Sequence, residues 1–456
     1  MKRNRQDMLS GPLLPSIISY TVPIILTGLL QLLFHAADLV VVGSKGEIYL
    51  SAVGATNSIT NLIVNLFIGL SVGAGVTMAH AMGSQDQEAI HRTVHTALPT
   101  ALIGGVALTV VGVALSETFL RWMDTPENVL PYSTLYMRIY FGGMIFNMIY
   151  NFGAALLRAA GDTRGPLIYL TIAGVINVGL NLIFVLVFDM TVDGVALATI
   201  SSQAISAILV VWALMRRTDA AKLIPKKLRI YKAQLLKMVR LGLPAGIQTS
   251  MFSISNVIIQ SSINSFGDIV MAGNTAAASI EGFIYVTVNA FHQTALNFTG
   301  QNVGARQYRR VKKLMLICLA CGFTAGLVAG SGVYLLREPL LKIYIVDSPN
   351  AAAAIAAGVE RMLYACIPYF VLGLMDVTTG VLRGMGTSLT PMIISVLGIC
   401  GLRILWISTI FESHHTIRAL FLSYPISWGA TFLFQLIACI MVYRKRVTAQ
   451  LSPDKI

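Results

Sequence analysis

The sequence predicts an all-α integral membrane protein with twelve transmembrane helices, arranged as two pseudo-symmetric six-helix lobes. Of the 456 residues, 55% are hydrophobic and only 12% are charged, and the apolar residues gather in long uninterrupted segments. A spanning helix needs about 20 apolar residues, and the segments lack the alternation that a membrane β-barrel requires. This composition excludes soluble globular, disordered, fibrous and disulfide-scaffold classes.

Each predicted span is one apolar segment, with an uncertainty of about four residues at its ends. The segments are 15–43, 51–79, 93–116, 129–157, 166–188, 194–215, 236–264, 270–300, 313–336, 353–382, 390–411 and 419–443. Three prolines inside them predict kinks, namely Pro23, Pro244 and Pro368. The first segment is too long for the core of a signal peptide, so we expect it to be retained.

Lysine and arginine are concentrated in every second loop and at both ends of the chain, which predicts cytoplasmic termini. The net charge of +13 therefore indicates membrane topology and contact with anionic lipid, and no nucleic-acid partner is expected. The basic stretch 216–235 is the predicted linker between a lobe at 1–215 and a lobe at 236–443, and 444–456 is a cytoplasmic tail. We expect a monomer in the plasma membrane, the inner membrane of a bacterial cell.

The two halves carry traces of an internal repeat. A shift of 221 residues aligns Pro23 with Pro244, and a shift of 225 aligns LLRAAGDTRGP at 156–166 with VLRGMGTSLTP at 381–391. Because six spans separate the copies, both halves are predicted to have the same orientation in the membrane, with a central cleft between them.

Three acidic residues fall inside predicted spans, namely Asp38, Glu281 and Asp376. A charge at such a position costs about 2.5–3.5 kcal/mol, so these residues are candidates for function. Asp38, Asn181 and Thr199 lie at nearly one depth, and Asn177 is one helical turn from Asn181. Their oxygens suit a sodium ion, while a buried carboxylate can instead carry a proton. The alternative is a structural polar clamp between helices.

The second half offers Glu281, Asp376 and Arg403 as candidates for ion coupling or substrate binding. Glu281 and Arg403 both lie in the outer half of the membrane, so a structural ion pair and a coupling role are both open. Asp376 lies nearer the cytoplasmic side, and the 225-residue shift makes Asn151 its counterpart in the first half.

The histidines give weaker signals. His35 precedes Asp38 by one helical turn, and we expect a core histidine rather than a group that tunes the acid. His91 and His95 have helical spacing without a third ligand, so a solvated cytoplasmic helix end is expected rather than a zinc site. The sequence contains no phosphate-binding GxxxxGK[ST] motif and no nucleophile with its base. We therefore expect a protein that is not an enzyme and that uses no organic cofactor.

Several motifs together resemble the multidrug and toxic compound extrusion (MATE) family of secondary transporters over essentially the whole chain. They are LLQLLFHAADLVVVGSKGEIYLSAVGA, LLRAAGDTRGP, GVINVGLNLIFV, GVALATISSQ and FTGQNVGARQYRRV. The resemblance implies drug or metabolite efflux driven by inward sodium or proton movement, with alternating access between two lobes.

In this family a matching acid of the first span and polar residues of the fifth and sixth form a cation site. The resemblance therefore implies that Asp38, Asn177, Asn181 and Thr199 couple the ion. Some relatives carry Asp where Asn181 stands, which leaves Na⁺ and H⁺ both open. Asp376 resembles an acid that contributes to coupling in many members. A further acid of the seventh span is missing here, which puts a complete sodium site in the second lobe in doubt.

These features predict a secondary active multidrug exporter, an antiporter of Na⁺ or H⁺ and amphipathic organic cations, which a mainly apolar cleft with a few acids would select. The alternative is a flippase for lipid-linked saccharides or another lipid-like substrate. Such a flippase would need several basic residues in the cleft, whereas Arg403 alone is assigned to a span. A membrane enzyme would need clustered catalytic groups, and a non-transporting receptor would leave the buried acids unexplained.

Overall fold

The computed structural model describes residues 6–345 and 349–451, and in these ranges all regular secondary structure is helical. The α-helices are α1 Leu13–Gly43, α2 Glu47–Gly83, α3 Gln87–Trp122, α4 Leu130–Gly142, α5 Met144–Ala159, α6 Arg164–Leu182, α7 Val192–Met215, α8 Lys232–Asn264, α9 Asp268–Gly304, α10 Tyr308–Leu335, α11 Arg337–Tyr344, α12 Ala351–Ala365, α13 Tyr369–Gly384, α14 Leu389–Ser395, α15 Leu402–Trp406 and α16 Ile417–Leu451. The 3₁₀ turn η2 is Pro225–Lys227, and the π-helical turns are η1 Ile183–Val187, η3 Val396–Gly401 and η4 Ile407–Phe411. The ends of the predicted first lobe and tail, 1–5 and 452–456, lie outside the described residues, as does the segment 346–348.

Nine helices of the described chain are long and apolar enough to cross a membrane, and two bent pairs bring the total to eleven. The bent pairs are α4 with α5, at 47°, and α12 with α13, at 46°. The less apolar α8, with 33 residues, is not among these eleven but coincides with the predicted segment 236–264. Each predicted segment therefore coincides with one helix, one bent pair or one helix carrying π turns, which confirms the predicted fold class.

Pro368 lies at one of these bends, as expected, because proline lacks the N–H that would continue the helix. Pro23 and Pro244, in contrast, lie inside α1 and α8 without ending either helix.

The two halves are built from the same series of helices. Both α2 and α9 contain 37 residues, and they begin 221 residues apart, at Glu47 and Asp268. In the same way, α7 and α16 begin 225 residues apart, at Val192 and Ile417. These are the two shifts at which the sequence aligns with itself, so the weak sequence repeat corresponds to a structural repeat.

The chain forms two compact units, each with its own buried core. The first contains Val22–Ser250, and the second contains Met8–Thr21 and the chain from Met251 onward. Two helices are thus divided between the units, α1 after Thr21 and α8 after Ser250. The predicted lobe boundaries at 215 and 236 stay predictions.

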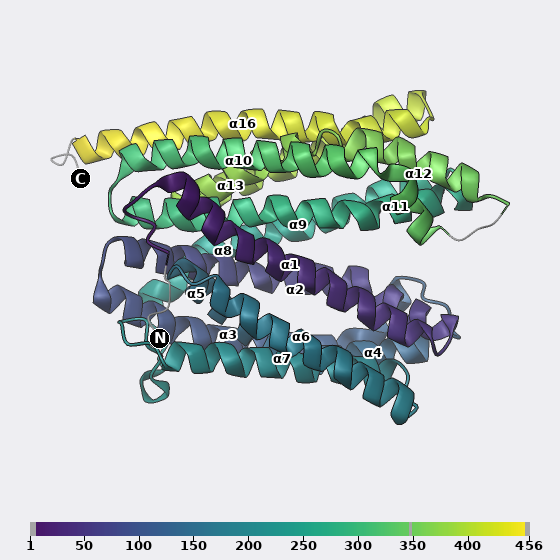
Figure 1. Ribbon diagram of the computed structural model, residues 1–456, viewed down its shortest axis with the longest axis horizontal. Coiled ribbons are helices and arrows are strands. Elements are labelled where there is room, and N and C mark those ends of the chain that lie inside the picture. The colour runs from purple at the N-terminus through teal and green to yellow at the C-terminus, as the bar shows by residue number, and fades with distance from the viewer. Residues whose placement is uncertain (1–5, 346–348, 452–456) are drawn as a thin grey trace. The chain divides into compact units, whose positions relative to one another are not determined.

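Packing within each unit centres on a few helices (Figure 1). In the first unit α3 packs against α4 and α5, and α6 packs against α7. The buried core there includes Phe141, Met144 and Phe152. In the second unit α9 packs against α10, α12 and α13, and α13 also contacts α16.

The segment that follows α7 is held against the start of α3. His95 is 0% exposed, and its Nε2 accepts a hydrogen bond of 3.1 Å from the backbone N–H of Ile224. The neighbouring Thr96 Oγ1 accepts a hydrogen bond of 3.1 Å from the N–H of Tyr231. The expectation of a solvated helix end is therefore wrong at His95, because the linker covers this residue.

Candidate functional site

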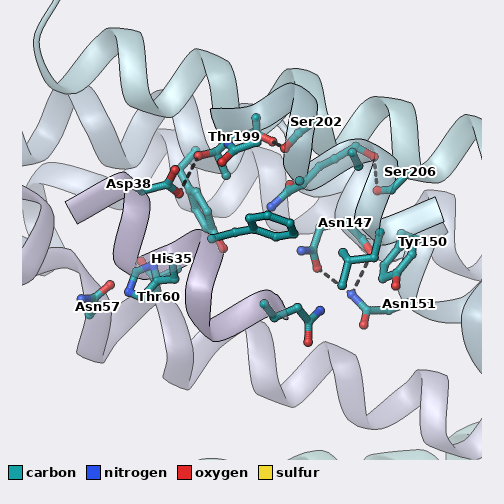
Figure 2. Close-up of a pocket in the computed structure, with 18 of the residues that line it drawn as sticks. His35, Asp38, Asn57, Thr60, Asn147, Tyr150, Asn151, Thr199, Ser202 and Ser206 are labelled. Atoms are coloured by element: carbon teal, nitrogen blue, oxygen red, sulfur yellow. Dashed lines mark hydrogen bonds between the residues drawn. The ribbon is translucent and has the colours of Figure 1, made fainter. Parts of the chain in front are cut away.

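A polar cavity of about 510 Å³ lies inside the first unit, lined by residues of α1, α2, α4, α5, α6 and α7 (Figure 2). Four of its lining residues have apolar side chains or none, namely Phe34, Leu170, Ala173 and Gly174. Seven others carry side-chain amides, namely Gln31, Asn57, Asn61, Asn147, Asn151, Asn177 and Gln203. The side chains that line this cavity are thus mostly hydrogen-bonding groups.

Asp38 of α1 lies at one end of this cavity and is 8% exposed. Its Oδ1 accepts a hydrogen bond from Asn181 Nδ2 of α6, which also donates to Asn177 Oδ1 at 3.3 Å. The hydroxyl of Thr199 on α7 lies 3.4 Å from Asp38 Oδ2 and 2.9 Å from its own backbone acceptor, Val195 O. The structure therefore brings together all four residues predicted for the first half.

Local sequence explains why these helices meet here. A Cβ atom at Gly174 of α6 would lie 1.8 Å from the Phe34 ring of α1, so only glycine permits this close packing. Asn177 and Asn181 are four residues apart and share one face of α6. The π turn η1 begins at Ile183, two residues beyond Asn181, and such turns are frequent at functional sites.

The donor set around Asp38 fits a small hard cation. Asn181 is 0% exposed, and its Oδ1 has no hydrogen-bond partner although it is buried. A half-turn of the amide would direct this oxygen to the carboxylate and to Asn177 Oδ1, an arrangement that needs a cation between the oxygens. One carboxylate, two amide oxygens and a hydroxyl are ligands suited to such an ion. In the described chain no three His, Cys, Asp or Glu side chains form a metal cluster.

His35 lines the same cavity and its side chain is exposed there, so the prediction of a core histidine is wrong. The reason is that the face of α1 that carries His35 and Asp38 borders a cavity rather than a packed interior.

Glu281 forms an ion pair in the second unit, but with a residue that the sequence analysis did not consider. Its Oε2 lies 2.7 Å from Arg361 Nη2 of α12, and Arg361 Nη1 donates to Asn274 Oδ1 at 2.5 Å. Arg403 instead donates from Nε to Ser427 Oγ at 3.1 Å and stacks over Tyr424. Of the two roles left open for Glu281, the structural pair with Arg403 is therefore not formed, because Arg361 is the partner, and the coupling role stays a prediction.

From the sequence, Arg403 alone was assigned to a span, and Arg361 was treated as one of the arginines and lysines that indicate orientation in the membrane. It nevertheless lies well inside the predicted span 353–382 and is only 7% exposed. This intramembrane position was the signal that could have identified it.

Asp376 belongs to a separate group around α13. The residue is 9% exposed, and its backbone carbonyl accepts a hydrogen bond of 2.7 Å from His292 Nδ1. On the other side of the ring, Arg383 Nη1 lies 3.4 Å from His292 Nε2. His292 and Arg383 were not predicted as partners, since nothing in their spacing relates α9 to α13.

Comparison with known proteins gives one consistent result. The family model MatE matches residues 23–183 and 244–407. The "Probable multidrug resistance protein YpnP" of Bacillus subtilis is 26% identical over 446 residues, which cover 96% of each chain. The "Probable multidrug resistance protein NorM" of Thermotoga maritima is 25% identical and covers 84% of this chain and 82% of its own.

A solved structure described as the outward-facing conformation of a multidrug resistance MATE family transporter of the MOP superfamily shares the fold. Its TM-score is 0.90 at 19% identity, and the match covers 98% of this chain and 100% of that chain. The family resemblance read from the sequence motifs is confirmed. The chain belongs to the MatE family and is therefore a multi-pass membrane transporter, not an enzyme.

Proposed function

We propose that the chain is a secondary active exporter that extrudes small organic molecules in exchange for inward movement of Na⁺ or H⁺. The observation that carries this proposal is the buried Asp38 carboxylate beside the unpartnered oxygen of Asn181. Such an acid is costly in a membrane protein unless it holds a cation or a proton. The relatives named as multidrug resistance proteins support the direction of transport and the class of cargo.

The proposed cycle uses alternating access. A cation entering from outside neutralises Asp38, which removes the charge that holds Asn181 Nδ2 and Thr199 Oγ1 in their present places. The contacts among α1, α6 and α7 then change, and the affinity for the organic molecule falls in the outward-facing state. Ion binding and cargo release are coupled because both depend on the same three helices.

The cavity volume supports cargo of drug size, since pockets for such molecules measure about 300–1,000 Å³. Amphipathic organic cations remain the first substrates to test, because Asp38 is the only charged acid that lines the cavity among the described residues. A monomer in the inner membrane of a bacterium, with both termini in the cytoplasm and lipid around the basic loops, completes the proposal.

The flippase alternative receives no support from the cavity. A lipid-linked diphosphate requires basic side chains around it. Among the residues that line the cavity in the described chain there is neither lysine nor arginine.

Transport by purified full-length protein in proteoliposomes tests the proposal. Ethidium is placed on the side from which export begins, and an inward Na⁺ gradient or an inward pH gradient is imposed separately. We expect uphill ethidium movement with at least one gradient, and none when both gradients are collapsed. Ethidium movement that ignores both gradients would refute ion coupling.

A further inference from the structure

The cavity of the first unit has a second end that the coupling cycle does not use. Figure 2 shows Asp38 and Thr199 at one end and Asn147, Tyr150, Asn151 and Ser206 at the other. We call the second group, together with Gln203, the amide end. These residues come from α5 and α7, whereas Asp38 lies on α1.

Hydrogen bonding inside the amide end leaves one donor and one acceptor on two side chains that are hydrogen-bonded to each other. Asn151 Nδ2 donates to the backbone oxygen of Asn147 at 2.9 Å and to Asn147 Oδ1 at 3.0 Å. Both amide hydrogens of Asn151 are thereby used. Within the described chain, Asn151 Oδ1 and Asn147 Nδ2 have no hydrogen-bond partner. A bound molecule thus meets an adjacent acceptor and donor.

Two further polar atoms of the amide end are buried without a partner. They are Gln203 Oε1 and the hydroxyl of Tyr150. A buried polar group without a hydrogen bond is unfavourable, so a small rotation of either side chain that lets the atom pair with a ligand is favoured. The amide end therefore favours polar ligands over purely apolar ones.

The walls of the cavity suit a flat ring. Tyr136 and Tyr140 both line the cavity, with their ring centroids 6.1 Å apart and their planes inclined by 14°. Aromatic side chains of this kind bind rings by offset stacking or edge contacts. The absence of lysine and arginine among the described lining residues makes the cavity unsuitable for phosphates.

We propose that the amide end recognises uncharged heteroaromatic rings that carry neighbouring donor and acceptor atoms, as nucleobases do. The acceptor Asn151 Oδ1 and the donor Asn147 Nδ2 supply the two kinds of group with which a side-chain amide pairs with adenine. The exporter's cargo then includes neutral, nucleoside-like compounds in addition to organic cations. The inference rests on the proposed function for the direction of transport, but binding can be measured without transport.

Equilibrium dialysis of radiolabelled adenosine against the full-length protein in lipid nanodiscs tests the inference. Cytidine, guanosine and uridine serve as competitors, adenosine monophosphate tests charge, and tetraphenylphosphonium is measured separately as an apolar cation. We expect adenosine to bind, at least one other nucleoside to compete, and the monophosphate to bind about tenfold more weakly because no basic residue lines the cavity.

Two variants localise the binding. Asn151→Leu and Gln203→Leu keep roughly the side-chain volume and remove the hydrogen-bonding groups, and each should weaken adenosine binding about tenfold. Tetraphenylphosphonium binding should stay unchanged in both variants. Asn65→Leu is the matched control on α2, outside the cavity lining, and should bind adenosine as the parent does.

Two outcomes would overturn the inference. One is a protein that binds tetraphenylphosphonium but none of the four nucleosides. The other is equal adenosine binding by Asn151→Leu, Gln203→Leu and Asn65→Leu. If nucleosides bind as expected but no ion gradient drives ethidium, the proposed function fails and the binding inference stands.

Discussion

Asn181 Nδ2 donates a hydrogen bond to Asp38 Oδ1 and so joins α6 to α1 at the acidic end of the cavity. The same nitrogen also lies 3.3 Å from Asn177 Oδ1, so one amide satisfies two oxygens of the predicted cation site. A cation that enters the site must replace this amide nitrogen. The proposed ion coupling therefore requires an exchange between an amide-bridged state and an ion-bridged state.

Asp38→Asn should abolish uphill export while the protein stays folded and inserted. The substitution keeps the size of the side chain and one oxygen that can accept from Asn181 but removes ionisation, so neither Na⁺ nor H⁺ can be exchanged. Ethidium export in proteoliposomes and thermal unfolding in detergent are the two measurements. Full gradient-driven export by the folded variant would remove Asp38 from the mechanism.

Removing single oxygens around Asp38 should weaken the ion site rather than the cargo site. Asn177→Ala, Asn181→Ala and Thr199→Ala should each raise the ion concentration needed for half-maximal export, because each residue supplies one ligand. The measurement is ethidium export as a function of Na⁺ concentration and of pH. If the three variants reduce export equally at all Na⁺ concentrations and pH values, the residues form the structural clamp instead.

Breaking the ion pair of the second unit should destabilise the protein, and removing both charges should restore much of the loss. Glu281→Gln leaves the buried Arg361 without its counter-charge, which costs about 3–5 kcal/mol. Arg361→Gln leaves Glu281 without its counter-charge and destabilises the protein in the same way. The double variant isolates the coupling between the two side chains. Thermal unfolding in detergent of the two single variants and the double variant gives the comparison.

Arg403→Gln is the control, because Arg403 bonds to Ser427 and its loss should not rescue Glu281→Gln. If Glu281 couples the ion instead, a different result is expected. In that case Glu281→Gln would keep nearly full stability and flatten the pH dependence of export, and Arg361→Gln would not compensate.

Replacing His95 should release the linker from α3. In His95→Leu the N–H of Ile224 loses its acceptor, whereas the amide oxygen in His95→Gln can accept from the same donor. We expect hydrogen exchange at Ile224 to accelerate in the leucine variant and to slow again in the glutamine variant. Thr96→Val should affect Tyr231 alone. Unchanged exchange at Ile224 in His95→Leu would mean that this hydrogen bond does not hold the linker.

The predicted depth of polar residues inside apolar segments was sufficient to identify the acidic end of the cavity. Asp38, Asn181 and Thr199 were predicted at one level, and hydrogen bonds now join the three side chains. This succeeds because a spanning helix has a fixed rise per residue, so the position in the sequence gives the depth in the membrane. Depth alone does not give rotation, and for that reason His35 was misassigned to the core.

The partners of the second unit could not be obtained in the same way. Glu281 and Arg403 were predicted at similar depth, yet the helices α9 and α12 bring Glu281 to Arg361. The amide end of the first cavity was missed as well, because asparagine and glutamine carry no charge and so are not conspicuous in an apolar segment. Which helix faces lie opposite one another depends on packing between distant parts of the chain.

The apolar segments, their prolines and the repeat determined by themselves that the chain is a twelve-helix membrane protein, because lipid allows few other structures for such a composition. Packing between helices decided the Asn181–Asp38 bond and the Arg361–Glu281 pair, and it decided that the Asn147–Asn151 pair of α5 faces the cavity. Each of the first two contacts joins residues at least 80 positions apart in the chain, and the third depends on the rotation of α5 toward the cavity. The two contacts between distant residues form only when helix faces meet, since burial and hydrogen bonding act between surfaces that folding brings together.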